Sequence, residues 1–174
     1  MYHRRQFLAA TLGLIAGAGL TEARAAVPQR SLAFDNLHTG EKLSAIYWAD
    51  GRHVPDACQK IDRVLRDHRS GEVAAISPPL LDLLYILRTK LDKDAPFEVI
   101  SGYRSPKTNA SMVKPGGGVA SDSLHTRGMA IDIRMPGCGL ARLRDEATAL
   151  KLGGVGYYPK SDFVHVDIGR VRYW

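Results

Sequence analysis

The sequence predicts a single α+β domain built on a central antiparallel β-sheet, with helices packed mainly on one side. The chain has 174 residues, enough for one domain with a full core and too few for two. Its helix-like segments come first and most of its short strands come last, without the regular strand–helix alternation of a parallel sheet. Hydrophobic residues make up 45% and charged residues 24%, which is typical of a globular protein and excludes a disordered or collagen-like chain.

The first 25 residues have the organisation of an export signal. Arg4 and Arg5 precede an apolar run over residues 7–20, and the small residues Ala23 and Ala25 follow. The run is too short and too rich in glycine and alanine to indicate a membrane span. The adjacent arginines favour the twin-arginine route over an ordinary secretory signal, and that route exports folded proteins to the periplasm.

Cleavage after Ala25 would leave residues 26–174 as the catalytic domain, without a stable membrane insertion. The formal charge falls from +6 to +4, because three arginines and Glu22 are removed. This mild basic excess suits an anionic envelope polymer. No basic run or aromatic–basic interleaving indicates nucleic acid, and nothing indicates an oligomer, so we expect a monomer that does not bind nucleic acid.

Secondary structure is predicted from hydrophobic period and from turn residues. A hairpin opens the domain, with Gly40 in its turn, and two helices follow, the second starting at Ser77 as N-cap. A polar, glycine-rich stretch over 106–123 is predicted to be a mobile surface loop. The predicted strands are 31–37, 42–50, 96–101, 128–135, 155–158, 162–169 and 171–174, and the predicted helices are 54–70, 77–92 and 139–152.

Two cysteines, Cys58 and Cys138, leave two interpretations open. An exported protein reaches an oxidising compartment, where the two thiols could form a disulfide. Cys58 also falls where the first helix would bury it, so a small core residue is the favoured interpretation.

The stretch from Ser123 to Gly137, SLHTRGMAIDIRMPG, contains a histidine and an aspartate seven positions apart. Alternation along AIDIR places Asp132 on the strand face opposite Ile131 and Ile133. Alternation along DFVHVDIG places His165 on the face opposite the two valines and the isoleucine of that strand. If these strands are neighbours, the two side chains converge and His125 can join them. Two imidazoles and one carboxylate form a donor set for a first-row metal, although a surface salt bridge would use the same residues.

Three motifs together resemble the zinc D-Ala-D-Ala peptidase superfamily of VanX-type (LAS) metallopeptidases. SLHTRGMAID matches the Ser-x-His-x-x-Gly-x-Ala-x-Asp signature of that superfamily, with SGYRS upstream and DFVHVD downstream in the same order. The leader, the LHTGE hairpin and the GVGYYPKSDFVHVDIGRVRYW ending are most similar to its exported murein endopeptidase branch (YcbK-like, MepK). The resemblance spans nearly all of the mature chain and implies that the zinc site lies on the sheet.

The resemblance also implies a role for each matching residue. Zinc would be bound by His125, Asp132 and His165. The catalytic acid of the family lies three positions before the last histidine ligand, which is Asp162 here, and it would take a proton from the activated water and return it to the leaving amine. Many relatives have glutamate there, so the shorter side chain leaves Asp167 as a rival base, although orienting His165 is its favoured role.

Two further residues match the family around the metal. Arg104 in SGYRS corresponds to the arginine that steadies the polarised carbonyl oxygen, which makes it both a catalytic and a substrate-binding residue. Ser123 corresponds to the serine beside the first ligand, which contacts substrate or braces that histidine. The remaining histidines, His38, His53 and His68, have no partner at a telling spacing and are interpreted as surface or cap residues.

The implied function is a zinc-dependent murein endopeptidase that hydrolyses peptide cross-links of peptidoglycan during cell wall remodelling. Attack by an activated water needs no acyl-enzyme, which agrees with the lack of a persuasive Ser or Cys nucleophile in the sequence. Two alternatives remain open, a D,D-carboxypeptidase acting on stem peptides and a peptidoglycan-binding module without activity. Retention of every implied site residue argues against the binding module.

Overall fold

A computed structural model describes residues 28–113 and 120–174, so the predicted export signal and the Gly116–Gly118 run lie outside the described residues. The strands are β1 (Arg30–Asn36), β2 (Lys42–Ala49), β3 (Arg52–His53), β4 (Phe97–Ser101), β5 (Ala130–Arg134), β6 (Gly154–Tyr158), β7 (Phe163–Asp167) and β8 (Arg172–Tyr173). The helices are α1 (Pro55–Val64), α2 (Pro78–Leu91), α3 (Pro106–Met112) and α4 (Leu140–Leu150), with a short 3-10 helix, η1 (Leu124–Arg127).

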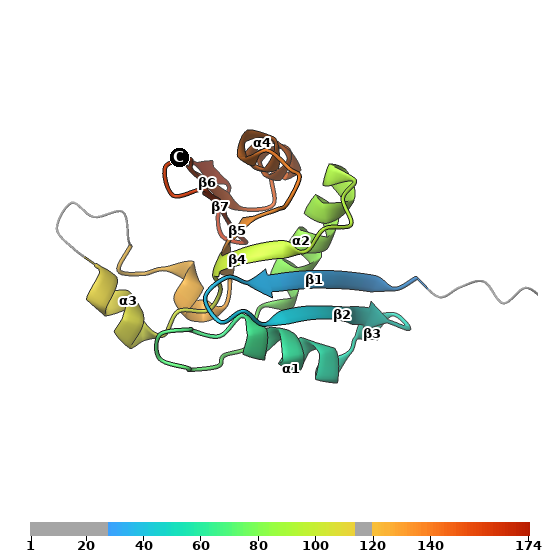
Figure 1. Ribbon diagram of the computed structural model, residues 1–174, viewed down its shortest axis with the longest axis horizontal. Coiled ribbons are helices and arrows are strands. Elements are labelled where there is room, and N and C mark those ends of the chain that lie inside the picture. The colour runs from blue at the N-terminus through green and yellow to red at the C-terminus, as the bar shows by residue number, and fades with distance from the viewer. Residues whose placement is uncertain (1–27, 114–119) are drawn as a thin grey trace, which may run out of the picture.

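All the strands belong to one sheet, in the order β3-β2-β1-β4-β5-β7-β6-β8. The single α+β domain is therefore confirmed (Figure 1). The sheet is mixed rather than wholly antiparallel, because β1 pairs with β4, and β6 with β8, in parallel. Both parallel pairs join strands that are separated by other elements of the chain, as parallel neighbours require.

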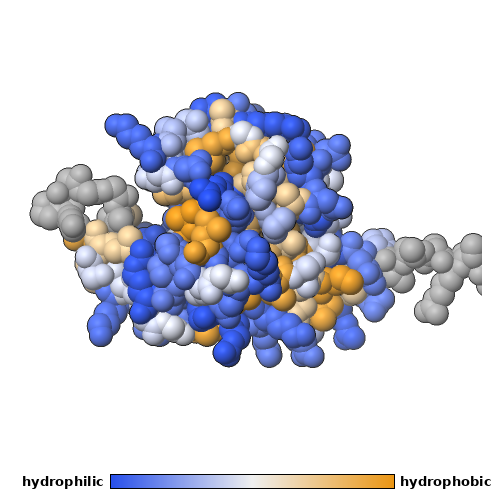
Figure 2. Space-filling model, in the orientation of Figure 1, coloured by the Kyte–Doolittle hydropathy of each residue, from blue (hydrophilic) through white to orange (hydrophobic). Residues whose placement is uncertain are grey.

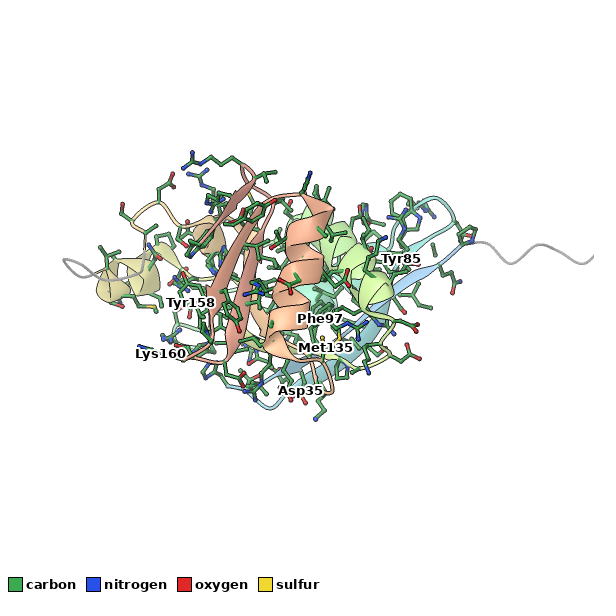
Figure 3. The ribbon with its side chains drawn as sticks, turned by 90° about the horizontal axis from the view of Figure 1, so that it is seen from above. Asp35, Tyr85, Phe97, Met135, Tyr158 and Lys160 are labelled. Atoms are coloured by element: carbon green, nitrogen blue, oxygen red, sulfur yellow. The ribbon has the colours of Figure 1, made fainter. Side chains whose placement is uncertain are left out.

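Helices α1, α2 and α4 cover one face of this sheet, as predicted. Alternate residues of the strands point towards these helices, and the side chains from both form one core. Phe97 and Met135 lie beside α4 in this core (Figure 3). Other buried members are Leu32, Phe34, Ile61, Leu80, Leu84, Leu87, Val99, Ile131, Ile133, Leu143, Val164 and Val166. The opposite face of β5 and β7 is left free of these helices, and the polar residues of the site lie there.

The first hairpin forms as the sequence predicts. Gly40 has a φ of +71° in the turn between β1 and β2, and the side chain of Asn36 accepts hydrogen bonds from the amides of His38 and Thr39. The following helix is shorter than expected, because α1 ends at Val64 and the chain then runs as a loop to Ser77. This loop passes the site and carries residues that contribute to it.

The predicted mobile loop over 106–123 is wrong at its start, where the chain forms α3. Pro106 occupies the first turn, and the Ser105 side chain accepts a hydrogen bond from the amide of Thr108. A serine N-cap followed by proline is a helix-start pattern that a polar, glycine-rich composition obscured. In Figure 1, α3 lies at the end of the molecule away from α2 and α4.

Cys58 and Cys138 are both free and partly buried, and both pack against the hydrophobic core. Burial raises the pKa of the Cys58 thiol, with a further contribution from the charge of Asp62, and this disfavours the reactive thiolate. The structure therefore agrees with the core interpretation of Cys58 rather than with the disulfide.

Polar and charged residues cover most of the face seen in Figure 2, with smaller apolar areas between them. Across residues 28–113 and 120–174, the helices are all too short or too polar to cross a bilayer.

Candidate metal centre

The site begins at the pairing of β5 with β7, the neighbouring strands that the sequence analysis required. Asp132 lies directly opposite His165 in the antiparallel register. Both side chains project from the face opposite the core, because Ile131, Ile133 and the valines flanking His165 fill the other face. The convergence of Asp132 and His165 is confirmed.

His125 reaches the same point from η1, just before β5. Ser123 caps this short helix by accepting a weak hydrogen bond from the His125 amide, at 3.4 Å. Gly128 ends it with a φ of +63°, and a Cβ there would come within 2.2 Å of the Ala75 carbonyl oxygen. Only glycine satisfies both conditions, so this position lets the chain turn tightly from His125 into β5.

Three atoms converge at this point: His125 Nε2, Asp132 Oδ1 and His165 Nδ1. The imidazole nitrogens are 3.2 Å apart, and Asp132 Oδ1 is 3.3 Å from His125 Nε2 and 2.8 Å from His165 Nδ1. Two atoms bound tetrahedrally to one zinc ion, at about 2.0–2.1 Å each, would be separated by about 3.3–3.4 Å. The separations therefore suit a single metal ion, and His125, Asp132 and His165, which we term the metal-binding cluster, are the group of described residues that could hold one.

Hydrogen bonds fix which nitrogen of each histidine is available to a metal. His125 Nδ1 lies 2.8 Å from the Gly102 carbonyl oxygen, which can only accept, so Nδ1 carries the proton and Nε2 presents its lone pair. His165 Nε2 lies 3.0 Å from Asp167 Oδ2, which assigns the proton to Nε2 and leaves Nδ1 for the metal. Partners of this kind orient metal-binding histidines and make the ligating nitrogen a better donor.

The charges of the cluster reinforce one another. Burial works against ionisation of Asp132, but the positive charge of His125 and His165 in their protonated, metal-free forms holds the pKa of this carboxyl below its usual range, and a metal cation on the same atoms would act in the same direction. Burial likewise opposes a charge on His165, yet hydrogen bonds to Asp132 and Asp167 raise its pKa. The site thus keeps an ionised carboxylate in a buried place, where a metal cation would be its natural partner.

Asp167 is fully buried and makes too many bonds to serve as a mobile base. Besides His165, it accepts hydrogen bonds from the Arg172 guanidinium and from the amides of Gly154 and Gly169. Burial opposes its ionisation, but the hydrogen bonds from His165 and Arg172 hold the pKa of Asp167 below its usual range. The geometry favours Asp167 as the group that orients His165.

Arg104 lies beside the metal-binding cluster, as its motif implied. Its guanidinium is buried, with Nη2 at 3.8 Å from Asp132 Oδ2 and Nη1 at 3.2 Å from the Asn109 side-chain oxygen. Its Nε is buried and has no hydrogen-bond partner among the described residues. Asn109 also donates to the carbonyl oxygens of Ala120 and Ser121, so α3 positions Arg104 and holds the chain leading to η1.

Asp162 differs from the other predicted site residues. It lies in the turn between β6 and β7, with a φ of +55°, and its side chain is 62% exposed. Its carboxylate accepts a hydrogen bond from Arg134, which also pairs with Glu98. Its neighbours Ser161 and Phe163 line the cavity over the cluster, whereas Asp162 itself points towards Arg134.

An open cavity of about 470 Å³ lies over the cluster and is lined by His125, Asp132 and His165. The Trp174 ring forms one wall, with its centroid 5.3 Å from that of His165. Gly156 makes room for this indole, because a Cβ at that position would lie 2.6 Å from the ring. Trp174 Nε1 donates to the Tyr158 hydroxyl at 2.7 Å, which fixes the ring on β6.

Sequence reasoning missed several residues that complete the site. His38 and His68, interpreted from the sequence as surface or cap residues, also stack with ring centroids 3.8 Å apart, and His38 lines the cavity with Arg69. Asn109 was missed together with α3, which the Ser105 cap could have revealed. Trp174 lies in the matched C-terminal ending but was given no role, because only the pairing of β6 with β8 brings it to His165.

Three protein donors would leave a coordination position of the metal free, and the buried guanidinium of Arg104 lies beside them, where it could stabilise negative charge on a substrate oxygen. This arrangement is typical of a metallohydrolase. Comparison with known proteins makes this class specific. A family model described as peptidoglycan L,D-endopeptidase MepK matches residues 24–174. The chain therefore belongs to this family of M15 metallopeptidases, and the resemblance found in the sequence is confirmed.

Individual relatives agree with the family match. The chain is 42% identical over 146 residues to the peptidoglycan L,D-endopeptidase MepK of Escherichia coli (strain K12), covering 83% of this chain and 80% of that protein. It is also 42% identical over 146 residues to a Haemophilus influenzae protein named "Probable peptidoglycan L,D-endopeptidase MepK", covering 83% of this chain and 78% of that protein.

Proposed function

We propose that this protein is a zinc-dependent murein endopeptidase that hydrolyses L,D peptide cross-links of peptidoglycan. The observation that carries the proposal is the meeting of His125 Nε2, Asp132 Oδ1 and His165 Nδ1 on adjacent strands beside Arg104. The relatives are named for the L,D activity, and this chain has a site able to perform a hydrolysis of that kind.

In this proposal, His125, Asp132 and His165 hold the zinc ion, and Asp167 orients His165. Zinc supplies Lewis acidity there and lowers the pKa of a bound water towards neutrality. The three ligands come from η1, β5 and β7, so the folded domain brings them together before any metal binds. This preorganisation reduces the ordering cost of binding the ion.

Asp162 is proposed as the general base and acid. Its carboxylate would accept a proton from the attacking water and return it to the amine that leaves when the peptide bond breaks. To do so it must turn away from Arg134, and its exposed position in a turn leaves room for that rotation. Its place three residues before His165 is the position of the catalytic acid in the superfamily that the chain resembles.

Arg104 is proposed to bind the carbonyl oxygen of the scissile bond. Negative charge develops on that oxygen as water attacks, and a fixed guanidinium stabilises it without having to reorganise. The position of the guanidinium supports the proposal, because Arg104 lines the cavity and its Nη2 lies 3.8 Å from Asp132 Oδ2 in the metal-binding cluster. Ser123 is proposed to brace His125 at the floor of the cavity and to contact substrate there.

The test is to incubate the purified mature protein with murein sacculi, with and without chelator, and to identify the released muropeptides by mass spectrometry. We expect cross-linked dimers to yield monomers only when metal is present, and the product to disappear in His165→Ala and Asp162→Ala. Release of terminal D-Ala without loss of dimers would indicate the D,D-carboxypeptidase instead. Binding to sacculi without any product would indicate the binding module.

We also propose export by the twin-arginine route to the periplasm, where peptidoglycan lies, and action there as a monomer. Folding before export would allow the metal to bind in the cytoplasm. Protein recovered from the periplasm should then contain one zinc when it travels through the twin-arginine system and less when its leader is replaced by a general secretory signal. Equal zinc content by both routes would contradict this proposal.

A further inference from the structure

A second cation, Arg69, lines the cavity that contains the metal-binding cluster. It lies in the loop after α1, its side chain is exposed, and it forms no ion pair with a carboxylate among the residues that the structure describes. The other charged groups of the same cavity are already paired: Arg172 with Asp167, and Asp122 with Arg127.

Arg69 is close enough to Arg104 for the two charges to influence each other. Burial is the largest influence on Arg104 and lowers the pKa of its guanidinium; the charge of Asp132 opposes this lowering, and that of Arg69 adds to it. Arg69 thus adds a positive charge to the cavity that no carboxylate of the described residues pairs with, and a negatively charged group of a ligand would be attracted to it.

A buried carboxylate holds the two arginine-bearing segments together. Asp67 is 1% exposed, and it accepts hydrogen bonds from the Arg69 amide at 2.9 Å and from the Ser105 amide at 3.0 Å. Burial works against its ionisation, but hydrogen bonds from the Thr108 side chain and from these amides hold the pKa of Asp67 well below its usual range. Asp67 thus fixes the backbone beside both arginines while leaving the Arg69 guanidinium without a partner.

We infer that Arg69 binds a carboxylate of the peptidoglycan stem peptide and positions the peptide over the metal-binding cluster. The inference rests on the proposed function, because stem peptides carry free carboxylates near their cross-links. A guanidinium binds a carboxylate through charge-assisted, often bidentate hydrogen bonds. Arg69 is in this view a positioning and specificity residue, whereas Arg104 meets the reacting carbonyl.

Binding measured without turnover tests the inference. The probe is the stem tripeptide L-Ala-γ-D-Glu-meso-diaminopimelate, titrated calorimetrically into zinc-loaded protein, beside the same peptide with every carboxyl group amidated. Arg69→Gln should raise the Kd for the carboxylate peptide by about tenfold to a hundredfold, and leave the Kd for the amidated peptide within about twofold. The Kd of Arg69→Lys for the carboxylate peptide should lie between those of the wild type and Arg69→Gln, because lysine keeps the positive charge but cannot form the bidentate hydrogen bonds of a guanidinium.

The matched control is Arg52→Gln, which removes the same charge from β3, at the far edge of the sheet. It should bind both peptides as the wild type does. Equal binding of the carboxylate peptide by Arg69→Gln and wild type would overturn the inference, and so would an equal loss for both peptides or no binding by the wild type. Thermal unfolding of each variant, expected to match the wild type, separates binding from folding.

Hydrolysis of cross-linked dimers separates the inference from the proposed function. Arg69→Gln should raise KM by about tenfold to a hundredfold and leave kcat within about twofold. A wild type that binds the carboxylate peptide through Arg69 and hydrolyses nothing would refute the proposed function and leave the carboxylate site standing. Normal hydrolysis by Arg69→Gln, with unchanged KM, would refute the carboxylate site alone.

Discussion

Two regions on the same face of the sheet differ in how they hold their acids. On β5 and at the end of β7, Asp132 and Asp167 are buried and bonded to several partners. In the turn between β6 and β7, Asp162 is exposed and held by Arg134. The difference agrees with the proposed roles: the groups proposed to fix a metal are built rigidly into the sheet, whereas the group proposed to move a proton lies where it can turn.

The largest expected effect comes from removing His165, a proposed metal ligand in the buried region. His165→Ala should reduce zinc content to background and lower the rate of dimer hydrolysis by about a thousandfold or more, because metal chemistry supplies several kcal/mol of transition-state stabilisation. Elemental analysis and muropeptide release measure the two effects. Excess zinc after chelation should restore the wild type and His53→Gln, and recovery in His165→Ala as well would show that His165 is not a ligand.

A smaller effect is expected in the exposed turn. Asp162→Asn should lower kcat by about a hundredfold to ten thousandfold, because the amide cannot take up the proton, while zinc content stays unchanged. Lys160→Gln, in the same turn, should retain full activity. If Asp162→Asn loses its zinc, the two regions are not independent, and if it keeps its activity another group is the base.

A smaller effect again is expected in the buried region at Asp167. Asp167→Asn should weaken zinc affinity by about tenfold to a hundredfold, because the amide orients His165 less firmly and leaves Arg172 without its charged partner. Competition with a chromophoric chelator measures this affinity, and Asp145→Asn on α4 removes an acid without touching the site. Unchanged affinity in Asp167→Asn would mean that the ligands alone set the strength of binding.

The smallest effect concerns the outer edge of the cavity, where His68 stacks on His38. Burial, with the charges of Arg69 and His38, lowers the pKa of His68 to about 4 in the folded protein, from an ordinary value of 6.5. The unfolded chain therefore binds the proton more readily, so His68 favours folding fully above pH 6.5 and loses that contribution as the pH falls towards 4.

The loss in the free energy of unfolding should be about 1 kcal/mol, because solvent screens a partly exposed group. Urea titrations at several pH values measure it in the wild type and in His68→Gln. The wild type should lose stability more steeply than the variant between pH 6.5 and 4. Parallel curves would show that His68 does not titrate differently in the folded protein.

Features of the fold and site that depend on residues close in the sequence were predicted correctly, whereas contacts between distant segments were not. The strand alternation around Asp132 and His165, the N-terminal hairpin and the bend at Gly40 depend on neighbours in the sequence, and each was predicted correctly. The contact of His125 with the Gly102 carbonyl and the stacking of His38 on His68 depend on loops brought together by the fold. No local pattern specifies such contacts.

The same reasoning explains the errors in the fold. The strands β1 and β4 are separated in the chain by β2, β3, α1 and α2, and their parallel pairing depends on how that long connection folds; hydrophobic alternation alone does not reveal strand direction. The helix α3 was missed because glycine-rich composition outweighed the Ser105 cap. Asp67 was missed because its partners, Arg69 and Ser105, meet only when the loop after α1 packs beside the start of α3.

The width of the cavity beside His165 depends on Gly156, a residue of β6 that has no side chain. Trp174 occupies the volume above Gly156, so residues 18 positions apart share one space. A side chain added at Gly156 would need a smaller ring at Trp174 or a shift of that ring. The two positions together therefore determine how wide the cavity is beside His165. Paired changes there would alter the size of peptide that the cavity admits and leave the proposed metal ligands in place.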